Sequence, residues 1–158
     1  MADLLPKSEV VTNLPLQMAL YFNCFFAPWW LLTHILTLYM KYTALDVIYQ
    51  VILITLHIVA VGVEVARLYL GFTGNLLEKI PELSGFWITT LILQFPIICF
   101  LLFHQGILVL PLERAMDMVQ LIFIVFEIGA GFAAVRKVAS HQVTKFQQQV
   151  LDKNEKTD

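Results

Sequence analysis

The chain has 158 residues, of which 59% are hydrophobic and 14% are charged, and its formal net charge is −2. Soluble domains carry about 25% charged residues, so this composition excludes an ordinary soluble domain and indicates a protein whose main partner is the lipid bilayer. The small net charge gives no sign of a nucleic-acid partner, and we expect none.

Four long apolar segments follow one another along the chain. They cover residues of about 16–40, 46–70, 85–106 and 112–135. A helix needs roughly 20 apolar residues to cross a bilayer core. The fourth segment reaches this length only if it begins near Leu112, which places Glu113, Arg114 and Asp117 at its outer edge. None of the segments has the polar stripe of a soluble surface helix, so each is predicted to be a transmembrane helix.

Proline and glutamate residues suggest how these helices are arranged. Pro28 and Pro96 lie well inside the first and third segments, where each removes a backbone hydrogen bond. Glu64 and Glu127 lie in the second and fourth segments. We therefore predict an all-α polytopic membrane protein whose four transmembrane helices form two hairpins within residues 15–137, each with a proline helix followed by a glutamate helix.

The basic residues predict an orientation. With four spans, the N-terminal segment 1–14, the loop 71–84 and the C-terminal tail 138–158 share one side of the membrane. That side carries Lys7, Arg67, Lys79, Arg136, Lys137, Lys145, Lys153 and Lys156. The opposite side carries Lys41 and Arg114. The positive-inside rule then makes both termini cytosolic. The tail has apolar residues at helical spacing, so it extends the fourth helix into the cytosol, lies on the membrane surface, or is a helix that binds a partner.

Three ionisable residues inside the spans are candidate site residues. Glu64 and Arg67 lie three positions apart and share one helix face, and Glu127 lies in the cytosolic half of the fourth span. An ionised side chain in the bilayer costs at least about 2.5–3.5 kcal/mol, so such groups face the bundle interior and find partners. We predict that Glu64, Arg67 and Glu127 form a structural polar clamp between the second and fourth helices. The alternative is a proton or cation relay in a small four-span transporter.

Other candidate chemistry is sparse. His34 and His57 lie in the first two spans and His104 near the end of the third, and His57 has no second ligand one helical turn away. We interpret these histidines as hydrogen-bonded within the bundle. Cys24 and Cys99 are too few for a zinc site. There is no Walker loop, G-x-S-x-G, C-x-x-C or H-E-x-x-H motif, so we expect no catalytic residue, no metal, no cofactor and no small-molecule substrate.

The predicted cytosolic loop 71–84 is the longest link and is rich in turn residues. Glycine and asparagine permit a positive φ, proline stiffens a return, and Ser84 could cap the third helix. The loop is either a docking surface or only the turn that any pair of helices needs. Its candidate docking residues are Gly71, Gly74, Asn75, Glu78, Lys79, Pro81 and Glu82.

Several short runs of sequence resemble one known family of membrane proteins. They are LQMALYFN at 16–23, PWW at 28–30, MKY at 40–42, EVARLYLG at 64–71, GNL at 74–76, EKIPELSGFW at 78–87 and LPLERA at 110–115. Together they resemble the transmembrane protein 17 family over residues of about 14–145. The central block, in which Glu-x-x-Arg-Leu-Tyr-x-Gly precedes Gly-Asn-Leu, carries most of the resemblance.

The resemblance implies a location and a role. Proteins of this family sit at the transition zone at the base of the cilium, in an assembly with tectonic and B9-domain proteins and other small transmembrane proteins. That assembly is a diffusion barrier that controls ciliary membrane composition and supports ciliogenesis and hedgehog signalling. The resemblance implies a non-enzymatic membrane subunit. The alternative from the residues themselves is a small transporter or channel that uses Glu64 and Glu127.

Overall fold

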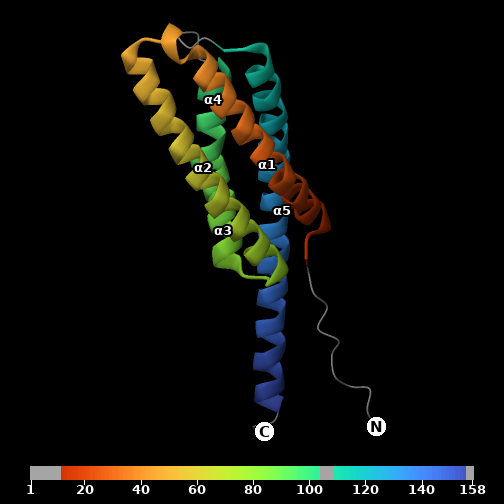
Figure 1. The fold of residues 1–158 in the computed structure, drawn as a ribbon. Helices are drawn as coiled ribbons and strands as arrows, with labels where there is room; N and C mark the ends of the chain where they lie inside the picture. Colours follow the sequence, from red (N-terminus) through yellow and green to blue (C-terminus); the bar gives the residue numbers. More distant parts are fainter. Residues whose placement is uncertain (1–11, 104–108, 156–158) are drawn as a thin grey trace.

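The computed structural model describes residues 12–103 and 109–155, and these form one elongated bundle of helices (Figure 1). The elements in chain order are α1 (Leu14–Lys41), the short 3-10 turn η1 (Tyr42–Ala44), α2 (Val47–Leu76), α3 (Ile80–Thr89), the π-helical turn η2 (Thr90–Gln94), α4 (Phe95–Phe103) and α5 (Pro111–Glu155). His104 lies outside the described residues.

Four helical segments are long and apolar enough to cross a membrane. They are Leu14–Ala44, Val47–Leu76, Ile80–Phe103 and Pro111–Leu151. The third joins α3, η2 and α4 without a break. No strand occurs among the residues that the structure describes, so the predicted all-α class with four transmembrane helices is confirmed. The grouping of these helices into two hairpins stays a prediction.

Each long helix buries one narrow stripe at a spacing of four and three residues. On α5 the buried positions are Glu113, Asp117, Gln120, Ile124, Glu127, Gly131, Ala134 and Val138. On α2 they are Leu53, His57, Ala60, Glu64, Arg67, Gly71 and Gly74, with Asn75 next to the last of them. This spacing is the repeat by which helices in bundles pack side by side. Large apolar side chains cover the outside and polar ones lie inside, because lipid surrounds the bundle.

The helices pack around two apolar clusters. Helix α5 packs against α1, α3 and α4, and α2 packs against α3 and α1. One cluster lies toward the end of the bundle that holds η1, here called the loop end, and includes Trp30, Leu53 and Ile124. The other lies toward the opposite end, here called the terminal end, and includes Leu20 and Phe86. Helices α2 and α5 are not among the closely packed pairs, so contacts between them depend on long side chains.

The link between α2 and α3 is shorter than predicted. Residues 71–76 belong to α2, and only 77–79 separate it from α3, so the prediction of a loop over 71–84 was wrong. No described glycine has a positive φ, and Glu78 is the residue that adopts one, at 53°. Ser84 lies inside α3, whose N-cap is Lys79. The two glycines of this segment serve close packing, which overrides their preference for turns.

That packing is tightest at Gly74. A Cβ atom at this position would lie 2.5 Å from the backbone nitrogen and 2.8 Å from the Cα of Leu83. At Gly71 a Cβ would lie 2.9 Å from a methyl of Leu20 and 3.0 Å from the ring of Phe86. Glycine therefore lets the backbones of α2 and α3 meet directly, as small residues do in membrane bundles.

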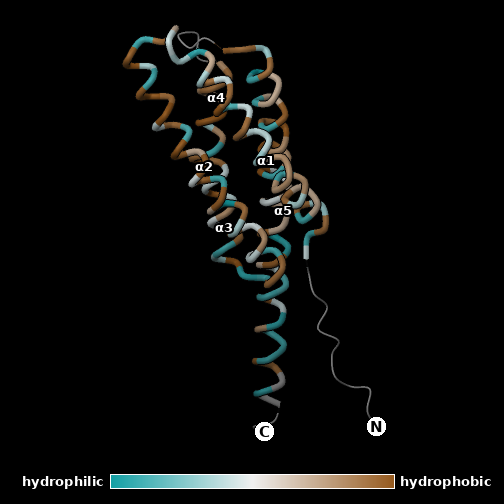
Figure 2. The backbone as a smooth tube through the Cα atoms, viewed as in Figure 1, coloured by the Kyte–Doolittle hydropathy of each residue, from teal (hydrophilic) through white to brown (hydrophobic). Residues whose placement is uncertain are grey.

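The chain after residue 137 continues as part of α5 rather than as a separate surface helix. Helix α5 runs without interruption to Glu155 and projects beyond the other helices (Figure 1). The projecting part is mostly hydrophilic, in contrast to the bundle (Figure 2). Gln142 Nε2 donates to the carbonyl of Glu78 at 2.7 Å and ties this extension to the α2–α3 link. Of the alternatives for the tail, the structure shows the extended helix, and a role of this helix in binding a partner stays a prediction.

Asn75 ties the start of α1 to the end of α2. Its Oδ1 accepts from the backbone nitrogen of Asn13 at 3.1 Å. Its Nδ2 donates to the carbonyl of Asn13 at 3.1 Å and to Gln17 Oε1 at 2.9 Å. The side chain of Asn13 in turn caps α1 by accepting from the backbone nitrogen of Leu16. These bonds fix where α1 begins.

Replacing Asn75 by leucine should therefore loosen the first turn of α1. The loss of buried hydrogen-bond partners is expected to cost about 1–3 kcal/mol. Hydrogen exchange of the protein in lipid nanodiscs should show faster exchange at residues 13–17. A matched control is Gln50→Leu, which removes two hydrogen bonds at the loop end, to the carbonyls of Tyr42 and Leu45. Equal protection of residues 13–17 in both variants would contradict the assignment.

Candidate functional site

The first buried polar cluster contains the three ionisable residues singled out in the sequence. Arg67 on α2 is fully buried. Its Nη2 donates to Glu64 Oε1 at 2.6 Å, and its Nη1 donates to Glu127 Oε2 on α5. Asn23 on α1 donates from Nδ2 to Glu127 Oε1 at 3.0 Å. The structure thus brings Glu64, Arg67 and Glu127 together, and Arg67 bridges the bundle from α2 to α5.

Helix geometry explains why these side chains meet. Glu64 and Arg67 occupy successive positions of the buried stripe of α2, and Glu127 occupies the buried stripe of α5. The guanidinium group offers donors in a fixed fork, so one arginine can bind two carboxylates at once. The guanidinium carbon also lies 5.7 Å from the ring centroid of Phe86, within cation–π distance. Arginine is therefore held by contacts with three helices.

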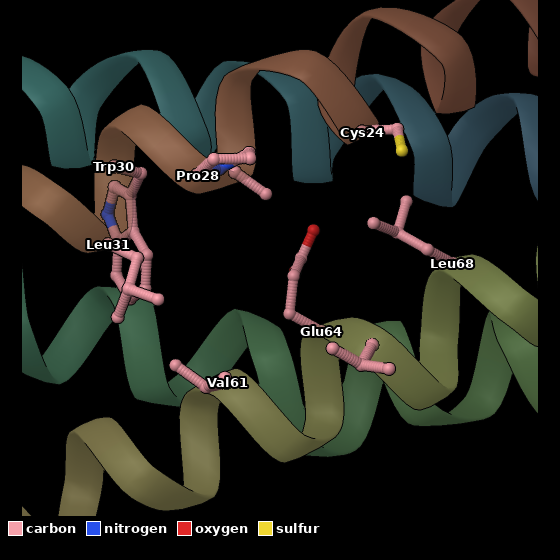
Figure 3. A pocket seen from close by; sticks show the side chains of 9 residues that line it. Cys24, Pro28, Trp30, Leu31, Val61, Glu64 and Leu68 are labelled. Carbon is pink, nitrogen blue, oxygen red and sulfur yellow. The ribbon is translucent and has the colours of Figure 1, made fainter.

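Part of this cluster has no hydrogen-bond partner within the described protein. Glu64 Oε2 and Arg67 Nε are both buried and unpaired. A cavity of about 290 Å³ lies beside Glu64, between α1 and α2. Its walls are apolar except for Glu64, whose side chain points into the space between the two helices, opposite Pro28 and Cys24 (Figure 3). A purely structural role of the cluster does not explain why this carboxylate oxygen faces an apolar cavity.

A second buried polar cluster lies nearer the loop end and was missed in the sequence. His34 on α1 contacts Asp117 on α5, with His34 Nε2 and Asp117 Oδ1 2.9 Å apart. His34 Nδ1 lies 2.9 Å from His57 Nε2 on α2. Lys41 Nζ donates to both carboxylate oxygens of Glu113 at 2.7 Å. The two histidines are hydrogen-bonded within the bundle, as expected, but they also belong to a buried polar network across three helices.

The two acidic residues of this second cluster lie near the start of α5, as predicted, but they face the interior of the bundle. The sequence places them, together with Arg114, at the outer edge of the fourth span. In the structure Glu113 is 2% exposed and Asp117 is fully buried, whereas Arg114 is exposed. The signal that could have found them is their spacing, since Glu113, Asp117 and Gln120 follow the same four-and-three repeat as Glu127. The partners follow the same repeat, with His34, Thr37 and Lys41 on α1 and His57 on α2.

The seven candidate docking residues do not form one surface. Gly71, Gly74 and Asn75 are buried inside the bundle. Lys79 is 49% exposed at its side chain and lies 3.3 Å from Glu82 Oε1, and Pro81 is exposed. Of these seven residues, only those around the short link thus reach the surface of the described protein. A docking role for this segment stays a prediction that rests on those exposed positions.

Comparison with known sequences identifies the family. The family described as "Predicted membrane protein" matches residues 18–124. Transmembrane protein 17 of Homo sapiens is 44% identical over 148 residues, which are 94% of this chain and 75% of the relative. This chain belongs to the transmembrane protein 17 family. The match confirms the resemblance seen in the sequence and makes the chain an integral, multi-pass membrane protein.

Two further relatives agree with this assignment. Transmembrane protein 17 of Gallus gallus is 44% identical over 148 residues, which are 94% of this chain and 71% of the relative. Transmembrane protein 17B of Danio rerio is 49% identical over 140 residues, which are 89% of this chain and 73% of the relative. The names of these relatives denote membrane proteins and none denotes an enzyme. No solved structure matches the chain.

Proposed function

We propose that this member of the transmembrane protein 17 family is a non-enzymatic structural subunit of a membrane assembly at the ciliary transition zone. Its partners there are tectonic and B9-domain proteins and other small transmembrane proteins. The assembly acts as a diffusion barrier that controls which membrane proteins enter the cilium, and it supports ciliogenesis and hedgehog signalling. The support for this proposal is membership of the family together with the buried, paired character of the intramembrane charges.

The arrangement of Arg67 carries the structural part of the proposal. Arg67 bonds to Glu64 on its own helix and to Glu127 across the bundle, and its side chain is sealed from solvent. A carboxylate already held by a guanidinium is poorly placed to exchange protons or cations, because each release would leave a buried charge unpaired. A fixed clamp is the role that this geometry supports best. A rigid bundle with an apolar outer surface suits a subunit that packs against other membrane proteins.

We further propose that both termini face the cytosol. The terminal end carries Lys79, Arg136 and Lys137, whereas the loop end carries Lys41 and Arg114. Lys41 is buried against Glu113, so few free basic groups face the loop end. The positive-inside rule then supports a cytosolic terminal end, with the hydrophilic extension of α5 in the cytosol. Exposed Lys79 and Pro81 would be accessible to cytosolic partners.

Localisation in ciliated cells tests this function directly. A tagged copy should form a ring at the cilium base beside a transition-zone marker, and depletion of the protein should change the entry of ciliary membrane cargo. Co-purification should recover other transition-zone membrane proteins. A diffuse plasma-membrane or endoplasmic-reticulum signal with normal cilia would reject the ciliary role, whatever the behaviour of the clamp.

A small transporter or channel is the second candidate, and the unpaired Glu64 Oε2 beside the cavity of α1 and α2 is the observation that favours it. In that case the purified protein should move cations or protons in liposomes, and Glu127→Gln should abolish the flux. A structural subunit should show no flux above that of empty liposomes. Flux that is equal in the wild type and in Glu127→Gln would exclude the clamp residues as the pathway.

A further inference from the structure

The second polar cluster gathers three side chains that commonly bind metal ions. His34, His57 and Glu113 come from α1, α2 and α5, and each offers one ligand atom within 4.8 Å of the others. His34 Nδ1 lies 2.9 Å from His57 Nε2 and 3.5 Å from Glu113 Oε1. All three residues are buried. Side chains from three helices thus bring two nitrogen atoms and one oxygen atom close together near the loop end.

Each histidine has one ring nitrogen that points away from the other histidine. The hydrogen bond of that nitrogen shows which nitrogen of the ring carries a proton. His57 Nδ1 lies 2.6 Å from the carbonyl oxygen of Leu53, which can only accept, so Nδ1 carries the proton and Nε2 is free to bind a cation. His34 Nε2 lies 2.9 Å from Asp117 Oδ1. That oxygen also accepts from Trp30 Nε1 at 2.9 Å, so it acts as a carboxylate acceptor.

His34 Nε2 therefore carries a proton, and when the His34 ring is neutral its Nδ1 has a lone pair that faces the lone pair of His57 Nε2. Two lone pairs 2.9 Å apart repel each other unless a proton or a metal ion lies between or beside them. A histidine whose outer nitrogen donates to a carboxylate or a backbone carbonyl is also the usual arrangement around a protein-bound metal. Both rings have such an outer partner here.

The charges around the cluster also favour the binding of a cation. Glu113 and Asp117 are two carboxylates, and Lys41 is the ammonium group that pairs with Glu113, with Nζ 2.7 Å from both of its oxygens. With both imidazoles neutral, two negative charges and one positive charge leave one negative charge uncompensated in an apolar setting. A shared proton between the rings would balance it, but a proton bridges only the two nitrogens. A metal ion would engage Glu113 Oε1 as well.

We propose that His34 Nδ1, His57 Nε2 and Glu113 Oε1 bind a divalent first-row transition-metal ion. Two imidazoles and one carboxylate are a ligand set that Zn²⁺ takes in proteins, usually with a fourth position open to water. Lys41 would remain on the second oxygen of Glu113. The ion would fasten α1, α2 and α5 to one another at the loop end, opposite the terminal end where Gly74 and Asn75 join helices without a metal. This inference is independent of the ciliary role.

The test uses the full chain in lipid nanodiscs, with Zn²⁺ and Co²⁺ as probes. Equilibrium dialysis followed by elemental analysis should find about one Zn²⁺ per chain, as expected for one set of three protein ligands. Co²⁺ should give visible absorption bands of a low-coordinate nitrogen and oxygen site. His57→Phe and Glu113→Gln should each weaken binding at least about tenfold, because even loss of an outer partner costs that much. Asp117→Asn should weaken it through His34.

Matched controls separate this site from others. His141→Gln removes a histidine on the extension of α5, and Glu127→Gln removes a buried carboxylate of the first cluster, so neither should change metal affinity. Size-exclusion profiles identify any variant that fails to fold. The Co²⁺ spectrum of the wild type needs no variant and keeps the test valid in that case. No metal uptake by the wild type, or uptake lost in His141→Gln but kept in His57→Phe, would overturn the proposal.

Discussion

Replacing Arg67 by alanine should destabilise the folded bundle by about 3–5 kcal/mol, the usual cost of leaving a buried ionic group without its partner. The variant would leave Glu64 and Glu127 without the guanidinium group that both of them bind. It would also remove the contact that crosses the bundle from α2 to α5. Thermal unfolding in nanodiscs, followed by loss of helical circular dichroism, measures the change. In cells the variant should be less abundant or should separate from the proposed complex.

Arg136→Ala is the matched control for this variant. Arg136 lies on α5 but is exposed, and its guanidinium carbon is 5.9 Å from the ring of Phe132. Its loss should change stability by no more than about 0.5 kcal/mol, as for most surface substitutions. A second test restores neutrality, since Arg67→Met combined with Glu64→Gln and Glu127→Gln should recover part of the lost stability. Normal abundance, assembly and stability of Arg67→Ala would reject the clamp.

Replacing Gly74 by alanine should have the second large effect, because the new methyl group would collide with backbone rather than with a flexible side chain. The Cβ would lie 2.5 Å from the nitrogen of Leu83, so α2 and α3 must move apart. Overpacking of this kind typically costs about 1–3 kcal/mol. Separation of the two helices should also raise hydrogen exchange across the link at 77–79. Thermal unfolding and exchange in nanodiscs measure both effects.

Gly62→Ala on the same helix is the matched control. A Cβ at Gly62 has nothing within 4 Å, and the residue is helical. Alanine there should be neutral or stabilise the helix by about 0.5–1 kcal/mol, because glycine loses more backbone freedom on folding. Opposite signs at two glycines of one helix would isolate the close approach of α2 and α3 as the cause. Equal effects at both positions would show that helix propensity, not packing, dominates.

Membership of the family and the division into membrane spans could be predicted from the sequence. Lipid requires an apolar surface around the whole bundle, so the spans stand out by length and hydropathy alone. The short spacing of Glu64 and Arg67 also fixes a shared helix face, whatever the rest of the fold does. Contact of these two residues with Glu127 could also be predicted, because the sequence places few other ionisable partners inside the membrane.

The segment 71–76 shows where local preference misleads. Its glycines and asparagine are typical of turns, yet the structure keeps them helical. The reason is tertiary: Gly74 admits the backbone of Leu83, and Asn75 bonds to Asn13, which is 62 positions away. No local pattern contains these contacts.

By itself the sequence determined that four segments are apolar enough to lie within the membrane, because the energy of transfer into lipid depends on each segment alone. It also determined that charged groups there would need partners. Only the tertiary structure decided which partners they have. His34 meets His57 and Asp117 at separations of 23 and 83 positions, through the relative rotation of three helices. That rotation is set by the packing of small and large side chains along the whole bundle, which no single segment encodes.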